Sequence, residues 1–236
     1  MKKTYRIALC LFVLLPVVFS VGWGSGTAQL PDPPIPQTDV MRSRTTTILS
    51  SSVNPSKCGQ AVTFTATVTS AGPTATGEVK FWNATTALGT ATLLDGVAKL
   101  TKSTLGYGFH WITAQYLGDS ASAKSRSPVV IQVVRPLIKS LSPASATAGS
   151  SSLTLAITGL CFPKGNSFVP GTQAFWVANG IATQLATTFV NRSMLTAVIP
   201  DSLLNTAVTA HIYVQYLDPL EGNGPKSNLV RFNVTD

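Results

Sequence analysis

The feature that most constrains the fold is a strict alternation of apolar and polar residues along several short segments. The segment 62–69 reads VTFTATVT, and the segment 208–216 reads VTAHIYVQY. A period of two places apolar side chains on one face of a strand and polar side chains on the other. Charged residues make up only 11% of the chain, and no long apolar stripe has the 3.6-residue period of a helix. The sequence therefore predicts an all-β protein.

Residues 45–134 carry strand signals at short and regular spacing. Asp95-Gly96 is typical of a tight hairpin turn, and it leads into a predicted strand at 97–100. The other predicted strands are marked by alternating apolar residues: Val62, Phe64, Ala66 and Val68; Val79 and Phe81; Leu88, Ala91 and Leu93; Ile112, Ala114 and Tyr116; and Val129, Ile131 and Val133, which close the set. With a first strand before Cys58, these make seven short strands in about 90 residues, which fit a Greek-key sandwich.

This first segment resembles the bacterial Ig-like repeats of group 3. The residues that carry the resemblance are Asn54-Pro55-Ser56, Gly59-Gln60, the VTFTATV strand, Gly77, and Tyr116 with Gly118-Asp119. The resemblance implies a surface or secreted β-sandwich that serves as a spacer or adhesive module, with turn and core residues at these positions and no catalytic ones. Cys58, Trp82 and Trp111 depart from the pattern of the repeats.

The same alternation returns over residues 135–236, where Asn179-Gly180 is typical of a hairpin turn and Pro200 ends a predicted strand. This segment resembles the IPT/TIG family of Ig-like modules, found in bacterial surface proteins, receptors and some transcription factors. The resemblance is carried by Ile138, Leu141-Ser142-Pro143, Gly149, Ile157-Thr158-Gly159, Phe162, Trp176, the stretch 195–200 and Ser227-Asn228. The predicted fold is thus two tandem immunoglobulin-like Greek-key β-sandwiches, residues 45–134 and 135–236.

Residues 1–28 have the pattern of a cleavable signal peptide. A positively charged start precedes the apolar run 7–21, and Gly26 and Ala28 supply the small residues before a cut after Ala28. The run of about 15 residues is short for a spanning helix, which needs about 20; an uncleaved anchor is the alternative. The proline-rich segment 29–44 is predicted to be an extended linker. We therefore expect a secreted or cell-surface protein with no membrane span after signal cleavage.

The chain offers little that could perform catalysis. Its two histidines, His110 and His211, lie in separate predicted strands, and its nine acidic residues are dispersed. We find no glycine-rich phosphate loop, nucleophile elbow, CxxC pair or HExxH motif. Asp218 and Glu221 are the only close acidic pair, and a weak calcium site there is an alternative. We expect a non-enzymatic protein with no cofactor and no metal site.

The charge pattern bears on partners. The formal net charge is +8, but the positive residues are scattered singly rather than clustered with aromatics, which argues against a nucleic-acid partner. Trp111 falls on the outward register of its strand, where an aromatic ring can stack on a sugar or a protein surface. His211 and Tyr213 fall on the outward register of 208–216 and are further ligand-contact candidates, although a solvated sheet face is the ordinary role of such residues. At least one of Trp82, Trp111 and Trp176 is expected to fill a core.

Outside the leader, one cysteine lies in each predicted sandwich. Cys58 falls in the loop between the first two strands of its sandwich, at the end where the last strand leaves. Cys161 falls in the loop between the second and third strands of the second sandwich, at the end where the chain enters. Because the connection near Pro136 is short, both sulfurs are expected at the junction of the two sandwiches. In an exported chain this placement predicts a Cys58–Cys161 disulfide; two unpaired thiols are the alternative.

These observations predict an exported structural or adhesive module that contacts an extracellular or cell-surface protein, without catalysis. The alternative is a carbohydrate-binding accessory protein that uses exposed aromatic residues on a polysaccharide. Fold alone does not decide between them, because Ig-like folds carry many functions.

Overall fold

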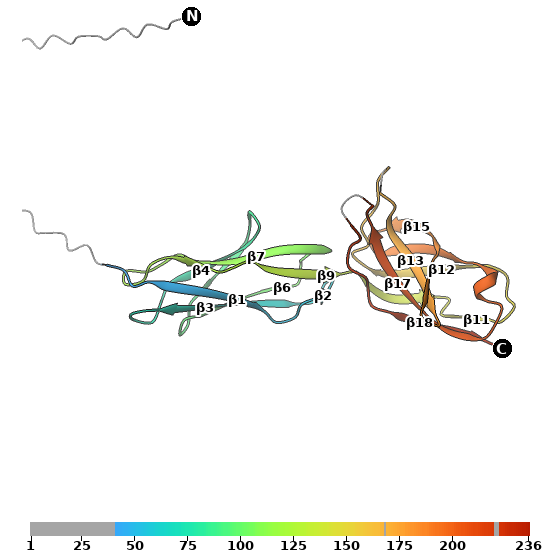
Figure 1. The fold of residues 1–236 in the computed structure, drawn as a ribbon, viewed down its shortest axis with the longest axis horizontal. Helices are drawn as coiled ribbons and strands as arrows, with labels where there is room; N and C mark the ends of the chain where they lie inside the picture. The colour runs from blue at the N-terminus through green and yellow to red at the C-terminus, as the bar shows by residue number, and fades with distance from the viewer. Residues whose placement is uncertain (1–40, 168, 220–221) are drawn as a thin grey trace, which may run out of the picture. The chain divides into compact units, whose positions relative to one another are not determined.

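The computed structural model describes residues 41–167, 169–219 and 222–236, which fall in one compact unit, Val40–Asp236. The predicted signal peptide and the predicted linker as far as residue 40 lie outside the described residues. The described part of the chain contains 18 strands, one short 3-10 helix and no α-helix. In Figure 1 the strands β1–β9, coloured blue to green, form one group and the strands from β10 onward form another. The all-β prediction is confirmed.

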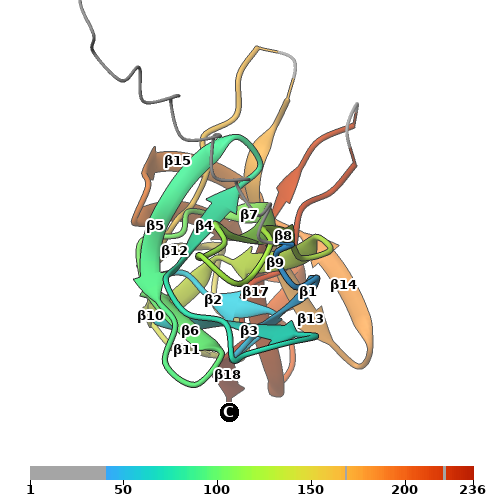
Figure 2. The same cartoon turned by 90° about the vertical axis from the view of Figure 1, so that its left-hand side faces the viewer.

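The first sandwich pairs a small sheet with a larger one. The small sheet has the order β1-β3-β6, with β1 at Thr45–Ser51, β3 at Val62–Ser70 and β6 at Val97–Lys102. The larger sheet has the order β2-β9-β7-β4-β5, and β8 pairs with β7. Its strands are β2 (Ser56–Lys57), β4 (Glu78–Asn83), β5 (Thr86–Thr92), β7 (Gly108–Tyr116), β8 (Ser125–Arg126) and β9 (Val130–Arg135). Figure 2 shows β4 and β5 side by side, as their antiparallel pairing requires.

The core of this sandwich follows directly from the alternation in the sequence. Val62, Phe64, Ala66 and Val68 of β3 are buried, whereas the threonines between them face outward. The facing sheet contributes a second set of buried side chains: Val79, Phe81, Ile112, Ala114 and Tyr116, each 0% exposed. Two inward faces that interdigitate in this way form the single core of a β-sandwich.

The second sandwich has a four-stranded and a five-stranded sheet. The four-stranded sheet has the order β10-β12-β16-β15, with β10 (Leu137–Ser142), β12 (Leu153–Leu160), β15 (Ala186–Asn191) and β16 (Met194–Ile199). The five-stranded sheet has the order β11-β18-β17-β13-β14, with β11 (Ser145–Thr147), β13 (Gly171–Ala178), β14 (Ile181–Gln184), β17 (Val208–Leu217) and β18 (Val230–Thr235). The 3-10 helix Asp201–Leu203 follows β16. Trp176 is the core tryptophan, 2% exposed and tilted against Phe232 at 5.5 Å between ring centroids.

Both sandwiches begin in the same way. The first strand, β1 or β10, joins one sheet, and the chain then crosses to the other sheet. There a short strand, β2 or β11, runs parallel to the last strand of the sandwich, β9 or β18. A cis peptide bond precedes the proline at each crossing, Asn54-Pro55 and Ser142-Pro143. The two halves therefore share one Ig-like topology, and the prediction of tandem sandwiches is confirmed.

Two turn predictions are confirmed, and three other local predictions need correction. The predicted hairpin turn at Asp95-Gly96 is confirmed: both residues have positive φ, 50° and 76°, and Leu94 and Val97 pair antiparallel across them with two backbone hydrogen bonds of 2.9 Å. Beyond this pair the two strands separate, β5 to pair with β4 and β6 to pair with β3. The expected hairpin at Asn179-Gly180 is confirmed, since β13 and β14 pair across it. The first correction concerns Ser43, which was predicted to lie in an unpacked linker. Its backbone amide donates a hydrogen bond to the carbonyl of Ala121, and its carbonyl accepts one from the amide of Ala123.

The second correction concerns the last strand of the first sandwich. The apolar residues expected to form its alternating set face outward: Val129 is 54% exposed and Ile131 is 50% exposed. Gln132 faces inward and is 0% exposed. Its amide oxygen accepts a hydrogen bond from the Ser51 hydroxyl at 2.6 Å, and its amide nitrogen donates to the carbonyl of Val53 at 3.0 Å. Because these bonds satisfy the amide, the polar residue is tolerated inside and the apolar residues are left on the surface.

The third correction concerns Tyr213, which was expected on an exposed face. It lies on the outer face of the five-stranded sheet but is only 6% exposed. Its ring stacks on Phe175, the residue directly opposite on β13, at 4.9 Å and 6° between planes. The amine of Lys226 lies over the same ring, 4.8 Å from its centroid. The Phe175 ring and the Lys226 side chain together cover Tyr213.

Candidate functional site

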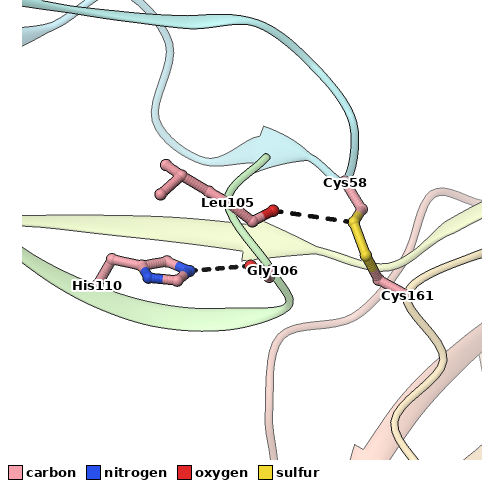
Figure 3. The surroundings of a disulfide bond; sticks show 5 residues. All are labelled: Cys58, Leu105, Gly106, His110 and Cys161. Carbon is pink, nitrogen blue, oxygen red and sulfur yellow. Dashed lines mark hydrogen bonds between the residues drawn. A yellow bond between two sulfur atoms is a disulfide. The ribbon is translucent and has the colours of Figure 1, made fainter. Parts of the chain in front are cut away.

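The first feature of functional interest is a disulfide that joins the two sandwiches. Cys58 and Cys161 are bonded, with 6.2 Å between their Cα atoms, a separation typical of disulfides. Figure 3 shows the bridge beside the loop that carries Leu105 and Gly106; the carbonyl oxygen of Leu105 lies 4.0 Å from the Cys58 sulfur. The predicted Cys58–Cys161 pairing is confirmed.

Strand register explains why the two cysteines meet. The backbone amide of Cys58 donates to the carbonyl of Arg135, the last residue of β9, at 2.9 Å. On the other side Leu160, which precedes Cys161, lies opposite Leu137, the first residue of β10. Both cysteines are therefore neighbours of the connection Arg135–Leu137, which we call the joint. Cys161 itself adopts a positive φ of 58°.

Apolar contacts surround the bridge. Cys58 is 7% exposed and belongs to the core of the first sandwich, against which Leu160 and Cys161 also pack. The Tyr107 and Tyr216 rings lie 6.0 Å apart, and burial, followed by the nearby Tyr216, raises the pKa of Tyr107. Gly224 lies so close to the Tyr107 hydroxyl that a Cβ at this position would overlap it. The two sandwiches are thus joined by packed side chains as well as by the disulfide.

The second feature is an apolar surface on the outer side of the larger sheet of the first sandwich. Trp111 on β7 lies directly opposite Ile131 on β9, and Phe109 lies opposite Val133. Val129 precedes Ile131 by two residues and faces the same way. Phe109, Trp111, Val129 and Ile131 are each 50–54% exposed. We call Phe109, Trp111, Val129, Ile131 and Val133 the apolar face.

Pairing makes the apolar face contiguous, which distinguishes it from single exposed apolar residues. Scattered residues of that kind are normal on soluble proteins, whereas large contiguous apolar patches are rare on them. The edge of β9 beside the apolar face is closed by Asn54, whose amide donates to the Ile131 carbonyl at 2.7 Å and accepts from the Val133 amide at 2.9 Å. A partner at this surface would therefore contact side chains and would not pair with the backbone of Ile131 and Val133.

The two histidines lie in different sandwiches, His110 on β7 and His211 on β17. His110 Nδ1 accepts a hydrogen bond from the Asn83 amide at 3.0 Å, so Nε2 carries the proton that is donated to the Gly106 carbonyl at 2.9 Å (Figure 3). Both ring nitrogens of His110 are thus engaged in hydrogen bonds within the first sandwich. His211 is half-buried on the outer face of the second sandwich, opposite Val177 and Arg231. Trp82 is also half-buried, with the Lys80 amine 4.4 Å above its ring.

Asp119 illustrates how the acidic residues are used. One carboxylate oxygen accepts hydrogen bonds from the Thr76 amide and hydroxyl, both at 2.8 Å. The other accepts from the amides of Ala121 and Ser122, at 2.8 and 2.6 Å. The bonds from Thr76, and then those from Ala121 and Ser122, hold the pKa of Asp119 well below its ordinary value. The predicted turn role of Asp119 is confirmed.

In the stretches that the structure describes, no group of three or more His, Cys, Asp or Glu side chains is arranged to hold a metal ion. Glu221, one of the two residues of the alternative calcium site, lies outside those stretches. No helix among the described residues is long and apolar enough to cross a membrane.

Comparison with known proteins identifies the first sandwich. Residues 49–135 match the bacterial Ig-like domain (group 3). This confirms the resemblance proposed for the first sandwich, whereas the resemblance of the second to IPT/TIG modules stays a prediction. No curated protein sequence matches the chain.

Solved structures with some likeness to the chain include three from very different sources. The fibronectin(III)-like modules of Clostridium thermocellum CbhA are 17% identical, over 80% of this chain and 94% of that one, with a TM-score of 0.30. The human OSCAR ligand-binding domain is 12% identical over 78% of this chain and 97% of that one, with a TM-score of 0.28. The three N-terminal domains of the bacteriophage RB49 capsid protein Hoc are 13% identical over 81% and 59%, with a TM-score of 0.33. Likenesses of this strength carry no conclusion about function.

Proposed function

We propose that the protein is an exported, non-catalytic adhesive module that binds an extracellular or cell-surface protein through the apolar face. The observation that carries the proposal is the contiguous exposure of Phe109, Trp111, Val129 and Ile131 on one sheet face of a bacterial Ig-like domain. A few residues supply most of the binding energy of a protein interface, and tryptophan is enriched among them.

Three further features support export. The leader pattern of residues 1–28 is that of a secretory signal, the first sandwich matches a bacterial Ig-like domain, and the disulfide is of the kind that persists in oxidising compartments. Cleavage after Ala28 would leave the proline-rich segment ahead of the first sandwich. Such a segment acts as a spacer between the folded part and its surroundings.

The experiment compares three forms of the mature chain on an array of extracellular proteins. Trp111→Ala should weaken binding about tenfold or more, because it removes a central aromatic contact. Ile48→Thr is the matched control, since Ile48 is 60% exposed but lies on β1, in the opposite sheet of the same sandwich. Equal loss of binding in both variants, or none in either, would be evidence against the apolar face as the binding surface.

Carbohydrate binding is the second candidate, and one observation favours it. Phe109 and Trp111 project from the same face of β7, each about half exposed, so that two rings are available for stacking on sugar rings. The mature chain should then be retained on immobilised polysaccharide, and Trp111→Ala should abolish the retention. Retention that does not change in Trp111→Ala rejects this candidate.

A further inference from the structure

A groove lies on the outer side of the five-stranded sheet of the second sandwich, beside the end of β9. It is an open depression of about 420 Å³, lined by Arg135, Val177, Gly180, Ala182, Tyr213, Lys226, Ser227 and Leu229. A volume in this range is enough for several side chains of a bound ligand. We call it the β13–β17 groove.

The charged groups of the groove are all positive. Arg135 at the end of β9 and Lys226 in the loop before β18 are both exposed and line it, and no described acidic residue does. Arg231 lies opposite His211 at the neighbouring register of the same sheet face. A depression with cations and without carboxylates attracts an anionic ligand.

The remaining lining determines which anion fits. Val177, Ala182 and Leu229 form apolar walls, and Leu229 is 60% exposed. The Ser227 hydroxyl is already engaged, because it accepts from the Val214 amide at 2.9 Å and donates to the Asn228 carbonyl at 2.8 Å. A polysaccharide needs many side-chain partners for its hydroxyls, which this lining does not provide. A peptide with acidic and aliphatic side chains meets both the cations and the apolar walls.

From this combination we propose that the β13–β17 groove binds an extended acidic peptide segment of a partner protein. The peptide carboxylates pair with Arg135 and Lys226, and its aliphatic side chains lie against Val177, Ala182 and Leu229. This site shares no lining residue with the apolar face, although its Arg135 follows Val133 by two residues on β9. It also gives a role to Tyr213, since the covered tyrosine holds the Lys226 amine over its ring, at the groove.

The test uses the mature, oxidised chain and a fluorescein-labelled peptide of six alternating Glu and Leu residues, with binding followed by fluorescence anisotropy. The peptide should bind, and a Lys/Leu peptide of the same length should not. The double variant Arg135→Gln/Lys226→Met should bind the acidic peptide about tenfold more weakly, as expected for the loss of two exposed ion pairs. Lys99→Met, a change on β6 of the first sandwich, should leave the affinity unchanged.

Other outcomes overturn the proposal. Absence of binding by the acidic peptide at millimolar concentration, or equal binding of the basic peptide, removes the groove as an acidic-peptide site. An unchanged affinity in the double variant, with a thermal unfolding curve like that of the wild type, places the peptide elsewhere. Binding of polygalacturonate that depends on Arg135 and Lys226, without peptide binding, would show that the occupant is a polysaccharide.

Discussion

Replacement of both bridge cysteines, Cys58→Ser with Cys161→Ser, is predicted to destabilise each sandwich by a different amount. The bridge spans 103 residues in sequence, and for a fully unfolded chain the entropy of loop closure corresponds to about 4.7 kcal/mol. When only the first sandwich unfolds, the loop closed between Cys58 and the joint has about 77 residues and the stabilisation is about 4.5 kcal/mol. When only the second unfolds, the loop from the joint to Cys161 has about 24 residues and the stabilisation is about 3.4 kcal/mol.

Urea titration can measure these losses. Tryptophan fluorescence reports on both sandwiches, since Trp82 and Trp111 lie in the first and the buried Trp176 lies in the second. The urea midpoint of the first sandwich should fall by about 2–4 M in the double variant. The wild type in reducing agent should unfold like the double variant, and the double variant should not respond to reducing agent. Equal midpoints for the oxidised wild type and the double variant would refute the reasoning.

Three further predictions concern single residues. Gln132→Leu should lower the free energy of unfolding by about 1–3 kcal/mol in denaturant titrations, because the Ser51 hydroxyl and the Val53 carbonyl lose their hydrogen bonds to the Gln132 amide. An unchanged stability would show that these hydrogen bonds make no net contribution. Gly224→Ala should lower the melting temperature because the new methyl group overlaps the Tyr107 hydroxyl. Tyr107→Phe should restore part of the loss, and Gly106→Ala, which meets open space, should cost less. Asp119→Asn should be less stable than the wild type at neutral pH. Since the folded-state pKa of Asp119 is lowered, its contribution is complete above the ordinary carboxyl pKa of 3.8 and declines as pH falls below it. The melting curves of the two proteins should therefore converge in strong acid, and a constant difference down to pH 2 would contradict the assignment.

The parts of the fold that could be predicted from the sequence depend on local physical rules. The period-two alternation of 62–69 fixes which side chains are buried, and it assigned Phe64 and its neighbours to the core correctly. The Asn179-Gly180 turn needs positive φ at both positions, which these residues supply easily. The disulfide was also predictable, because a short joint and the topology of the sandwich restrict where each cysteine can lie.

The errors arose where a non-local contact overrides the local pattern. Gln132 is buried because Ser51 and Val53, far away in sequence, satisfy its amide. Alternation alone assigned Ile131 to the core, and the apolar face was missed except for Trp111. Tyr213 is covered by Phe175 from the adjacent strand and by Lys226 from a loop. Neither contact has a signal in the local sequence around 208–216.

The covalent joint between the sandwiches in an oxidising compartment is the central claim, and a mass measurement tests it most directly. The mature protein, isolated without reducing agent and digested with trypsin, should yield the peptide that contains Cys58 linked to the peptide that contains Cys161. Addition of a reducing agent should separate the two. Recovery of both peptides with free thiols from the unreduced protein would contradict the account.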